Sequence, residues 1–224
     1  MTATATPPVF TARALLLDMD GTLVNSDAVV DRVWRRWAER HGLDGDEVMK
    51  VVHGRQGHAS MAVLLPDRPA EENLADNARM LAEETADMKG VVAVPGAAEF
   101  LASLRSAGVA HALVTSADVP LSTARMAAAG LPLPDVRITA ESVGASKPDP
   151  EGFLKGAAEL GAGPGECVVF EDSGAGIAAG RSAGMRVVGV GPRAAVHGPD
   201  TVVRDLREVR VEALGGGAVR VYVG

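Results

Sequence analysis

Four groups of polar residues stand out in this sequence because each lies at the end of a short apolar run or soon after one. They combine carboxylates, hydroxyls and one ammonium, the side chains that hold a hard metal ion and a phosphoryl group. In chain order they are Asp18 with Asp20, Thr115 with Ser116, Lys147, and Glu171 with Asp172. If they meet in one place, the chemistry that they support together is phosphoryl transfer.

The carboxylates would serve both a metal ion and the reaction itself. Asp18, Asp172 and Glu171 suit Mg²⁺, which prefers oxygen ligands and keeps some of its waters. Asp18 is also a candidate nucleophile that attacks phosphorus to give an aspartyl-phosphate. Asp20 is then placed to protonate the leaving oxygen and later to accept a proton from water.

The remaining groups would bind the phosphate. Its negative charge repels a carboxylate nucleophile, so that charge must be neutralised before attack. The Thr115 hydroxyl, nearby backbone N–H groups and the Lys147 ammonium are suited to hold the phosphoryl oxygens, with Ser116 beside them.

Five short runs rich in Val and Leu are typical of parallel strands that are covered on both faces. They span 13–18, 110–115, 135–139, 166–171 and 185–190. Segments with helical spacing alternate with them, at 97–107, 119–129, 150–160 and 174–183. This alternation predicts an α/β fold, a doubly wound parallel sheet, whose ligands bind beyond the carboxyl ends of the strands. All four polar groups are therefore expected in one crevice.

The block from 25 to 94 interrupts this alternation and is helical in character. Helices are expected at 27–41, 44–53 and 70–88, with a further helical run at 59–65. We therefore predict a core domain formed by 1–24 and 95–224 and a helical domain inserted at 25–94. Trp34 and Trp37 lie on one face of the first of these helices, where packing is expected rather than substrate stacking.

The two ends of the chain carry different signals. Residues 209–223 indicate a terminal hairpin, a strand, a glycine-rich turn and a second strand. The first ten residues, MTATATPPVF, lack a basic region followed by an apolar one, so no signal peptide is expected and they are interpreted as a frayed tail.

Composition narrows the class of partner. Hydrophobic residues make up 47% and charged residues 23% of the chain, as in ordinary globular proteins. The formal charge of −7 argues against nucleic acid as a partner, because such a partner needs a basic face. No apolar run approaches the ~20 residues of a membrane span. Cys167, the single cysteine, is expected to be a buried structural thiol in a reducing, cytoplasmic setting. The protein is also expected to be a monomer.

Each polar group also has an ordinary structural interpretation. Paired aspartates cap turns, Thr115-Ser116 is a helix N-cap in most proteins, Lys147 could be a surface lysine, and Glu171-Asp172 could cap the following helix. Their shared position near strand ends favours the functional interpretation. The segment GAGIAAG, 174–180, is not a dinucleotide fingerprint, because its last glycine comes one residue late and an acidic pair precedes it.

The motifs around these residues resemble those of the haloacid dehalogenase superfamily. ALLLDMDGTLVNS (14–26), ALVTSA (112–117), SKPDPEGF (146–153) and VVFEDSGAGIAAG (168–180) resemble its four motifs in order. The resemblance implies that Asp18 is the nucleophile, that Asp20 is the acid/base, and that Thr115 and Lys147 bind phosphate. It also implies a metal site made of Asp18, the Asp20 carbonyl, Glu171 and Asp172.

The inserted helical block resembles the small cap of the subgroup that includes β-phosphoglucomutases and sugar phosphatases. VVHGRQGHAS (51–60) is similar to a motif of bacterial sugar phosphatases and glycerol-phosphate phosphatases. The resemblance implies a Mg²⁺-dependent phosphatase of a small sugar or polyol phosphate. It further implies that His53, Gly54, Arg55 and Gln56 form a loop that binds the substrate together with Ser116.

Other members of the superfamily are less compatible with these residues. β-Phosphoglucomutase is described as having a cap histidine twelve residues after the nucleophile, where this chain has Val30. Dehalogenases lack the second aspartate, Asp20, and a phosphonatase would need a cap lysine, for which only Lys50 and Lys89 are available. A non-catalytic phosphate-binding or regulatory module would be expected to lose at least one of the core residues, and none is lost.

Overall fold

Six parallel strands form the central sheet of the structure, a computed structural model that describes residues 9–224. From one edge to the other they are β6 (Val136–Ile138), β5 (Ala110–Val114), β2 (Ala14–Leu17), β7 (Cys167–Glu171), β8 (Arg186–Val190) and β9 (Thr201–Val203). The chain fills the sheet outward from β2 in one direction and then outward from β7 in the other. The boundary between β2 and β7 is therefore the switch point where ligands of doubly wound sheets bind.

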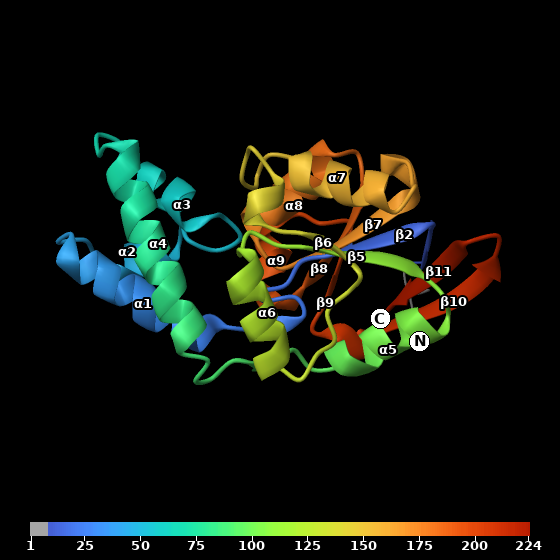
Figure 1. Ribbon diagram of the computed structural model, residues 1–224. Helices are drawn as coiled ribbons and strands as arrows, with labels where there is room; N and C mark the ends of the chain where they lie inside the picture. Colours follow the sequence, from blue (N-terminus) through green and yellow to red (C-terminus); the bar gives the residue numbers. More distant parts are fainter. Residues whose placement is uncertain (1–8) are drawn as a thin grey trace, which may run out of the picture.

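Helices cover both faces of this sheet (Figure 1). Leu15 and Leu17 of β2 face the cluster that includes α5 (Ala97–Ser106) and α6 (Val119–Ala128). Leu16 faces the cluster formed with α7 (Glu151–Glu159) and α8 (Gly174–Ser182). Burial on both faces explains why these strands are continuous apolar runs, and it confirms the predicted fold class.

The shorter elements complete the core. Helix α9 (Gly191–Ala194) follows β8, and single 3₁₀ turns occur at Ala140–Ser142, Pro164–Glu166, Ala195–His197 and Leu206–Glu208. Cys167 is buried at the start of β7, as expected, where burial and the nearby Glu166 raise the pKa of its thiol to about 11.

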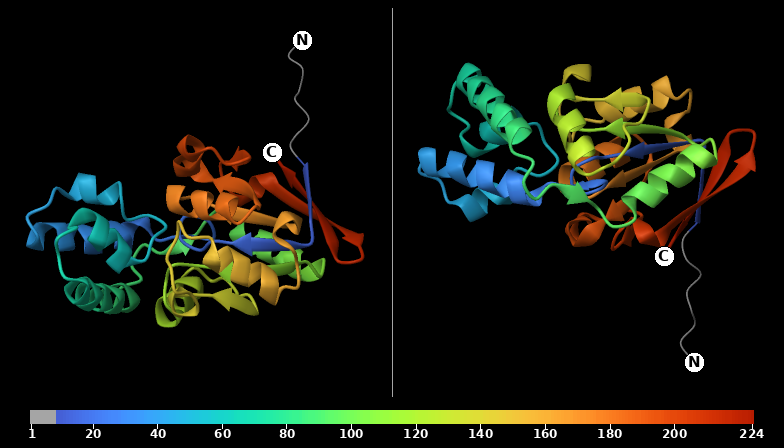
Figure 2. Two further views of the ribbon diagram at one scale, coloured as in Figure 1. Left: turned by 90° about the horizontal axis from the view of Figure 1, so that it is seen from above. Right: turned by 60° about the horizontal axis from the view of Figure 1, so that its bottom comes forward.

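A second, antiparallel sheet lies at the end of the molecule opposite the helical insertion (Figure 2). It contains β1 (Val9–Ala12), β11 (Ala218–Val223) and β10 (Val209–Gly215), so the predicted terminal hairpin is confirmed. The predicted frayed tail is wrong for its last two residues, because Val9 pairs with Tyr222 and Phe10 with Val221. This pairing joins residues that are far apart in the sequence, so the residues around Val9 carry no local pattern that predicts a strand. Residues 1–8 of that predicted tail lie outside the described residues.

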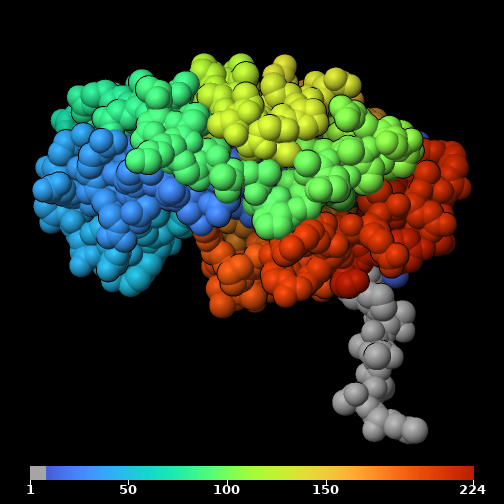
Figure 3. All heavy atoms as spheres, turned by 90° about the horizontal axis from the view of Figure 1, so that it is seen from below, coloured from blue at the N-terminus to red at the C-terminus, as the bar shows by residue number. Residues whose placement is uncertain are grey.

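Helices α1 (Asp27–Arg40), α2 (Gly45–Met49), α3 (Gly57–Leu64) and α4 (Ala70–Ala86), with the loops between them, form the cap. The cap lies against the core (Figure 3). It is joined to the core by the strand pair β3 (Val24–Asn25) and β4 (Val92–Ala93). The helix predicted at 44–53 is wrong beyond Met49, where the chain turns toward the core. No helix within residues 9–224 has the length and apolar character that crossing a bilayer requires.

Of the two tryptophans of α1, Trp37 packs as predicted, whereas Trp34 is buried but also lines the cavity between core and cap. Trp37 is completely buried, and its ring centroid lies 5.4 Å from that of Trp34 in an edge-to-face arrangement. The Trp37 Nε1–H donates to the buried Asp76 of α4 at 3.0 Å. This contact satisfies the indole N–H and fastens α1 to α4.

Candidate active site

The Asp18 side chain lies at the switch point, directly after β2. Its backbone N–H still belongs to the sheet and donates to the Phe170 carbonyl of β7 at 3.0 Å. The chain then turns through Gly21, whose φ of +89° favours glycine. A Cβ at Gly21 would lie 2.1 Å from Oδ2 of Asp172, so the turn can approach the second acidic pair only because this residue has no side chain.

Lys147 holds the centre of the site together. Its Nζ donates to Oδ1 of Asp18 at 2.7 Å, to Oε1 of Glu171 at 2.8 Å and to the Val114 carbonyl at 3.0 Å. Burial acts to lower the pKa of Lys147, but the charges of Asp18 and Glu171 outweigh it and raise that pKa above its ordinary value. The buried side chain is therefore a permanent ammonium.

Three carboxylates share this buried space. Asp18, Glu171 and Asp172 each offer an oxygen within 4.8 Å of the other two. Burial, followed by the charge of Glu171, raises the pKa of Asp18 to about 7, and the same two causes raise the pKa of Asp172 well above its ordinary value. Negative charge therefore exceeds what Lys147 supplies, and the oxygen-only donor set suits a hard divalent cation.

The three carboxylates differ in the number of hydrogen bonds that they accept. Both oxygens of Glu171 accept hydrogen bonds, Oε1 from Lys147 and Oε2 from the backbone N–H and the hydroxyl of Ser173 at 2.8 and 2.9 Å. Asp18 accepts from Lys147 through Oδ1. The structure brings together the predicted core residues and leaves Asp18 and Asp172 as the carboxylates with more free lone pairs.

The hydroxyl residues after β5 have different surroundings. Oγ1 of Thr115 accepts from the Ala117 N–H at 3.1 Å, so its own hydroxyl proton remains free to donate. Oγ of Ser116 donates to the Gly54 carbonyl of the cap at 3.0 Å. Ser116, predicted to bind substrate, lines the cavity and also joins the core to the cap.

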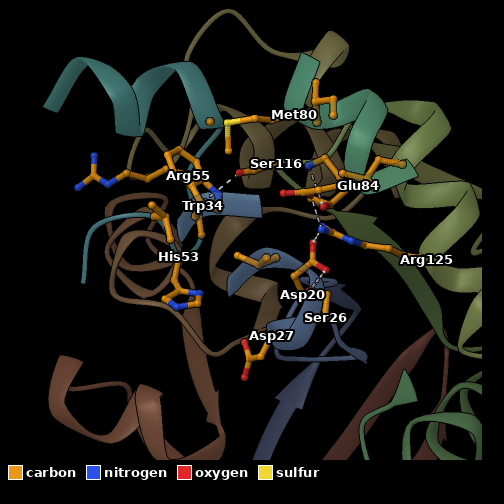
Figure 4. A pocket seen from close by; sticks show the side chains of 18 of the residues that line it. Asp20, Ser26, Asp27, Trp34, His53, Arg55, Met80, Glu84, Ser116 and Arg125 are labelled. Carbon is orange, nitrogen blue, oxygen red and sulfur yellow. Dashed lines mark hydrogen bonds and ion pairs between the residues drawn. The ribbon is translucent and has the colours of Figure 1, made fainter. Parts of the chain in front are cut away.

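The Asp20 carboxylate is held through both oxygens. Oδ1 accepts from the Ser26 hydroxyl at 2.6 Å, and Oδ2 accepts from NH1 of Arg125 at 2.9 Å (Figure 4). Sequence reasoning missed Arg125. A signal was present, because helical periodicity places it on the same apolar face of α6 as Leu121 and Met126, where an arginine needs a buried partner.

Above these residues lies a cavity between core and cap, with about 760 Å³ of free space that includes its opening to solvent. Its cap side combines apolar and polar side chains. From α1, α4 and the intervening loop they are Val30, Trp34, His53, Arg55, Asn77, Met80, Leu81 and Glu84.

The predicted cap loop is only partly directed at this cavity. Gly54 has φ +79°, and a Cβ there would lie 2.0 Å from the Ser173 hydroxyl oxygen, so glycine permits the loop to touch the core. Gln56 does not line the cavity. Its backbone N–H donates to the Ser146 hydroxyl at 2.9 Å and its Nε2 to the Ala140 carbonyl at 3.3 Å, so it fastens the loop to the core. Arg55 lines the cavity, with its guanidinium extending away from Asp20 (Figure 4).

Arg193 of α9 is a second residue that sequence reasoning missed. Its NH1 lies 2.6 Å from Nδ1 of His53 and 3.3 Å from Oδ2 of Asp172, and its NH2 donates to both oxygens of Asp27 at 2.8 and 2.9 Å. Burial and the charge of Arg193 lower the pKa of His53 to about 4, so the ring is neutral and Nδ1 accepts. Applying the strand-end rule to β8 as well would have located Arg193.

These observations define a class of protein: an enzyme with a doubly wound α/β core and a helical cap. Its carboxylates, lysine and threonine at the switch point are equipped for phosphoryl transfer. Residues 12–184 match the haloacid dehalogenase-like hydrolase family, and the chain belongs to it. It is a phosphatase of that family, a phosphoric monoester hydrolase, which confirms the predicted family and enzyme class.

Relatives of known activity and solved structures agree with this assignment. The chain is 39% identical to hexitol phosphatase A of Escherichia coli (strain K12), an alignment that covers 92% of this chain and 97% of the relative. It is 35% identical to validoxylamine A 7'-phosphate phosphatase of Streptomyces hygroscopicus subsp. limoneus, covering 91% and 98%. The fold alone is similar to the crystal structure of a β-phosphoglucomutase from Clostridium difficile, with a TM-score of 0.78, 22% identity, and 89% and 93% of the two chains covered.

Proposed function

We propose that this protein is a Mg²⁺-dependent phosphatase that hydrolyses a small sugar or polyol phosphate through an aspartyl-phosphate on Asp18. The observation that carries the proposal is the environment of Asp18. Asp18 is a buried carboxylate that accepts a hydrogen bond from the Lys147 ammonium at 2.7 Å and clusters with Glu171 and Asp172. It also lines the cavity that the cap covers.

The acidic cluster fits a magnesium ion in charge and in donor type. Asp18, Asp172 and the Asp20 carbonyl would hold it, with Glu171 beside them. When bound, Mg²⁺ would neutralise charge on the carboxylates and the phosphate and would favour the ionised form of Asp18.

The residues of this chain would then divide the reaction between them. The free hydroxyl proton of Thr115 donates to a phosphoryl oxygen, and the positive charge of Lys147 beside Asp18 reduces the repulsion between that carboxylate and the phosphate, while a carboxylate oxygen of Asp18 attacks phosphorus. The bond to the ester oxygen breaks as Asp20 transfers a proton to that oxygen. Asp20 then accepts a proton from a water that attacks the aspartyl-phosphate, which releases inorganic phosphate and restores Asp18.

The cavity supports a polyhydroxylated substrate. Asn77, Glu84 and Arg55 offer hydrogen-bonding groups, while Trp34 and Met80 offer apolar surface for a carbon skeleton. The two phosphatase relatives, at 39% and 35% identity, are named as a hexitol phosphatase and as a validoxylamine A 7'-phosphate phosphatase. We place the boundaries of the cap domain at residues 25 and 94, next to the β3–β4 pair.

The phosphomutase alternative is disfavoured by the cap. Val30, at the position where the resembled mutases are described as having a histidine, lines the cavity and has no proton to give or accept. Lys50, a candidate for phosphonatase chemistry, forms an ion pair with Glu47 on the surface of the cap instead.

We also propose that the protein is a cytoplasmic monomer. The monomer is proposed because a single chain supplies the residues of the cavity.

A panel of phosphate esters tests the proposal. Hexitol, hexose, glycerol and nucleoside phosphates are incubated with the protein, with Mg²⁺ or with EDTA, and released phosphate is measured. We expect hexitol or other polyol phosphates to be hydrolysed fastest and EDTA to abolish release reversibly. Equal release in EDTA would contradict the metal site, and a preference for nucleotides would contradict the substrate class.

A further inference from the structure

Arg125 bridges the core and the cap from a buried position. It belongs to α6 of the core and is 3% exposed. NH1 donates to Oδ2 of Asp20 at 2.9 Å, and NH2 donates to Oε2 of Glu84, on cap helix α4, at 2.5 Å. One guanidinium thus contacts the acid/base candidate with one nitrogen and the cap with the other.

Both partners need this contact. Glu84 is 6% exposed, and burial raises the pKa of its carboxyl while Arg125 acts to lower it. Burial likewise acts against the charged form of Arg125, but Asp20 and Glu84 outweigh it and raise the pKa of the guanidinium. A buried charge that loses its partner is strongly destabilised, so Arg125 and Glu84 are expected to keep this contact.

The geometry also fixes the plane of the Asp20 carboxylate. Ser26, the residue before α1, donates to one oxygen and Arg125 to the other, so rotation of the carboxylate breaks at least one bond. The guanidinium reaches the two carboxylates with two separate nitrogens, NH1 and NH2, and a lysine at this position would have to contact both from a single nitrogen.

We propose that Arg125 is a positioning residue for proton transfer, orienting the Asp20 carboxylate when Glu84 brings the cap against α6. The inference rests on the proposed function, in which Asp20 protonates the leaving oxygen. Correct orientation then depends on the cap as well as on the core, and the acid/base is in place when the cap covers the cavity.

A purely structural role for Arg125 makes a different prediction. Loss of packing would slow all substrates to a similar degree, and loss of cap contacts with the substrate hydroxyls would raise KM for sugar or polyol phosphates rather than lower kcat. Loss of Asp20 orientation slows sugar or polyol phosphates, whose alkoxide leaving group needs a proton, and spares p-nitrophenyl phosphate, whose leaving group does not.

The first test compares Arg125→Lys and Glu84→Gln with a control, Glu83→Gln. Glu83 is the preceding residue of α4 and pairs within the cap with Arg36 at 3.2 Å. We expect Arg125→Lys to lower kcat for a hexitol phosphate by about 10- to 100-fold and for p-nitrophenyl phosphate by no more than about 3-fold. Glu84→Gln should show the same selectivity more weakly, and Glu83→Gln should show none. Equal losses on both substrates would overturn the proposal.

The second test repeats Arg125→Lys in an Asp20→Asn background. If Arg125 acts through Asp20, the double variant loses no more than about twofold beyond Asp20→Asn, because effects of residues that act as a unit are not additive. Losses that multiply would overturn the proposal. Circular dichroism melts check folding, and if Arg125→Lys does not fold, Glu84→Gln carries both tests, since it removes the cap-side charge and keeps the side-chain shape.

The same measurements separate failure of the inference from failure of the proposed function. If Asp20→Asn slows both substrates equally, the acid/base role of Asp20 is wrong. If Asp20→Asn shows the leaving-group selectivity and Arg125→Lys does not, the role of Asp20 stands and only the role of Arg125 is wrong.

Discussion

The core and the cap hold their polar residues in different ways. Lys147, in the core, is 7% exposed and donates to three acceptors, each from a different strand end. Arg55, in the cap, lines the open cavity, and none of the ion pairs among residues 9–224 includes it. Buried groups with short bonds are preorganised for one transition state, whereas a partly exposed group can adapt to whichever substrate enters. The core therefore determines the reaction, and the cap is expected to select the substrate.

Replacing the nucleophile should have the largest effect. Asp18→Asn should lower kcat for every phosphate ester by more than about 100-fold, roughly 2.7 kcal/mol of barrier, because an amide does not attack phosphorus. The melting temperature in EDTA should not fall, since burial and Glu171 already disfavour the charged form of Asp18. Steady-state kinetics and calorimetry measure the two quantities. A variant that keeps more than about a hundredth of the kcat of the unaltered protein would refute the role of Asp18.

Removing a carboxylate of the cluster should weaken metal binding. Asp172→Asn is expected to lower the affinity for Mg²⁺ by at least about tenfold in isothermal titration calorimetry, and to reduce the stabilisation by Mg²⁺ in thermal melts. Glu159→Gln, an exposed acid of α7, is the control and should bind Mg²⁺ as the unaltered protein does. Ca²⁺ should restore little activity, because its larger and looser coordination shell misplaces the nucleophile. Unchanged Mg²⁺ affinity in Asp172→Asn would show that the ion binds elsewhere.

A smaller and more selective effect is expected in the cap. Arg55→Ala should lower kcat/KM for the preferred sugar or polyol phosphate, because hydrogen bonds to the substrate are lost. The expected loss of transition-state stabilisation is about 1–3 kcal/mol. Turnover of p-nitrophenyl phosphate, which offers no hydroxyls, should change little. Arg105→Ala, on the last turn of α5 in the core, is the control. An equal loss on both esters, or no loss at all, would remove Arg55 as a reader of specificity.

The smallest effect concerns the pH dependence of stability at the cap–core contact. His53 has a pKa of about 4 in the folded protein against an ordinary value of 6.5, so between these pH values the unfolded chain binds a proton that the folded chain does not. The contribution of His53 to the free energy of unfolding should therefore fall as the pH drops through this window, by up to about 1.4 kcal/mol per pH unit, whereas the raised pKa of Asp18 contributes with the opposite sign. His53→Gln removes only the first contribution, so its stability should fall less, or rise more, than that of the unaltered protein in urea titrations at pH 6.5, 5.5 and 4.5, values inside or at the edge of the roughly two-unit window. An unaltered slope would show that His53 is exposed to solvent.

Local pattern alone was enough to predict much of the molecule. Strands such as 13–18 and helices such as 97–107 were located within one or two residues, because burial on two faces or on one face sets the spacing of apolar residues. The strand-end rule then placed Asp18, Thr115 and Lys147 in one site without knowledge of the contacts. Parallel strands end at a common edge, so position in the chain carries the information.

Contacts between distant segments were decided only by the tertiary structure. Arg125 reaches Asp20 across 105 residues of sequence, and Arg193 reaches His53 across 140. Neither arginine carries a mark of its partner in its neighbours, because the direction of a long side chain depends on how α6 or α9 packs against the rest of the fold. The same reason hid the pairing of Val9 with Tyr222. Sequence determined which residues lie at the strand ends, and packing decided how the cap is bonded to them.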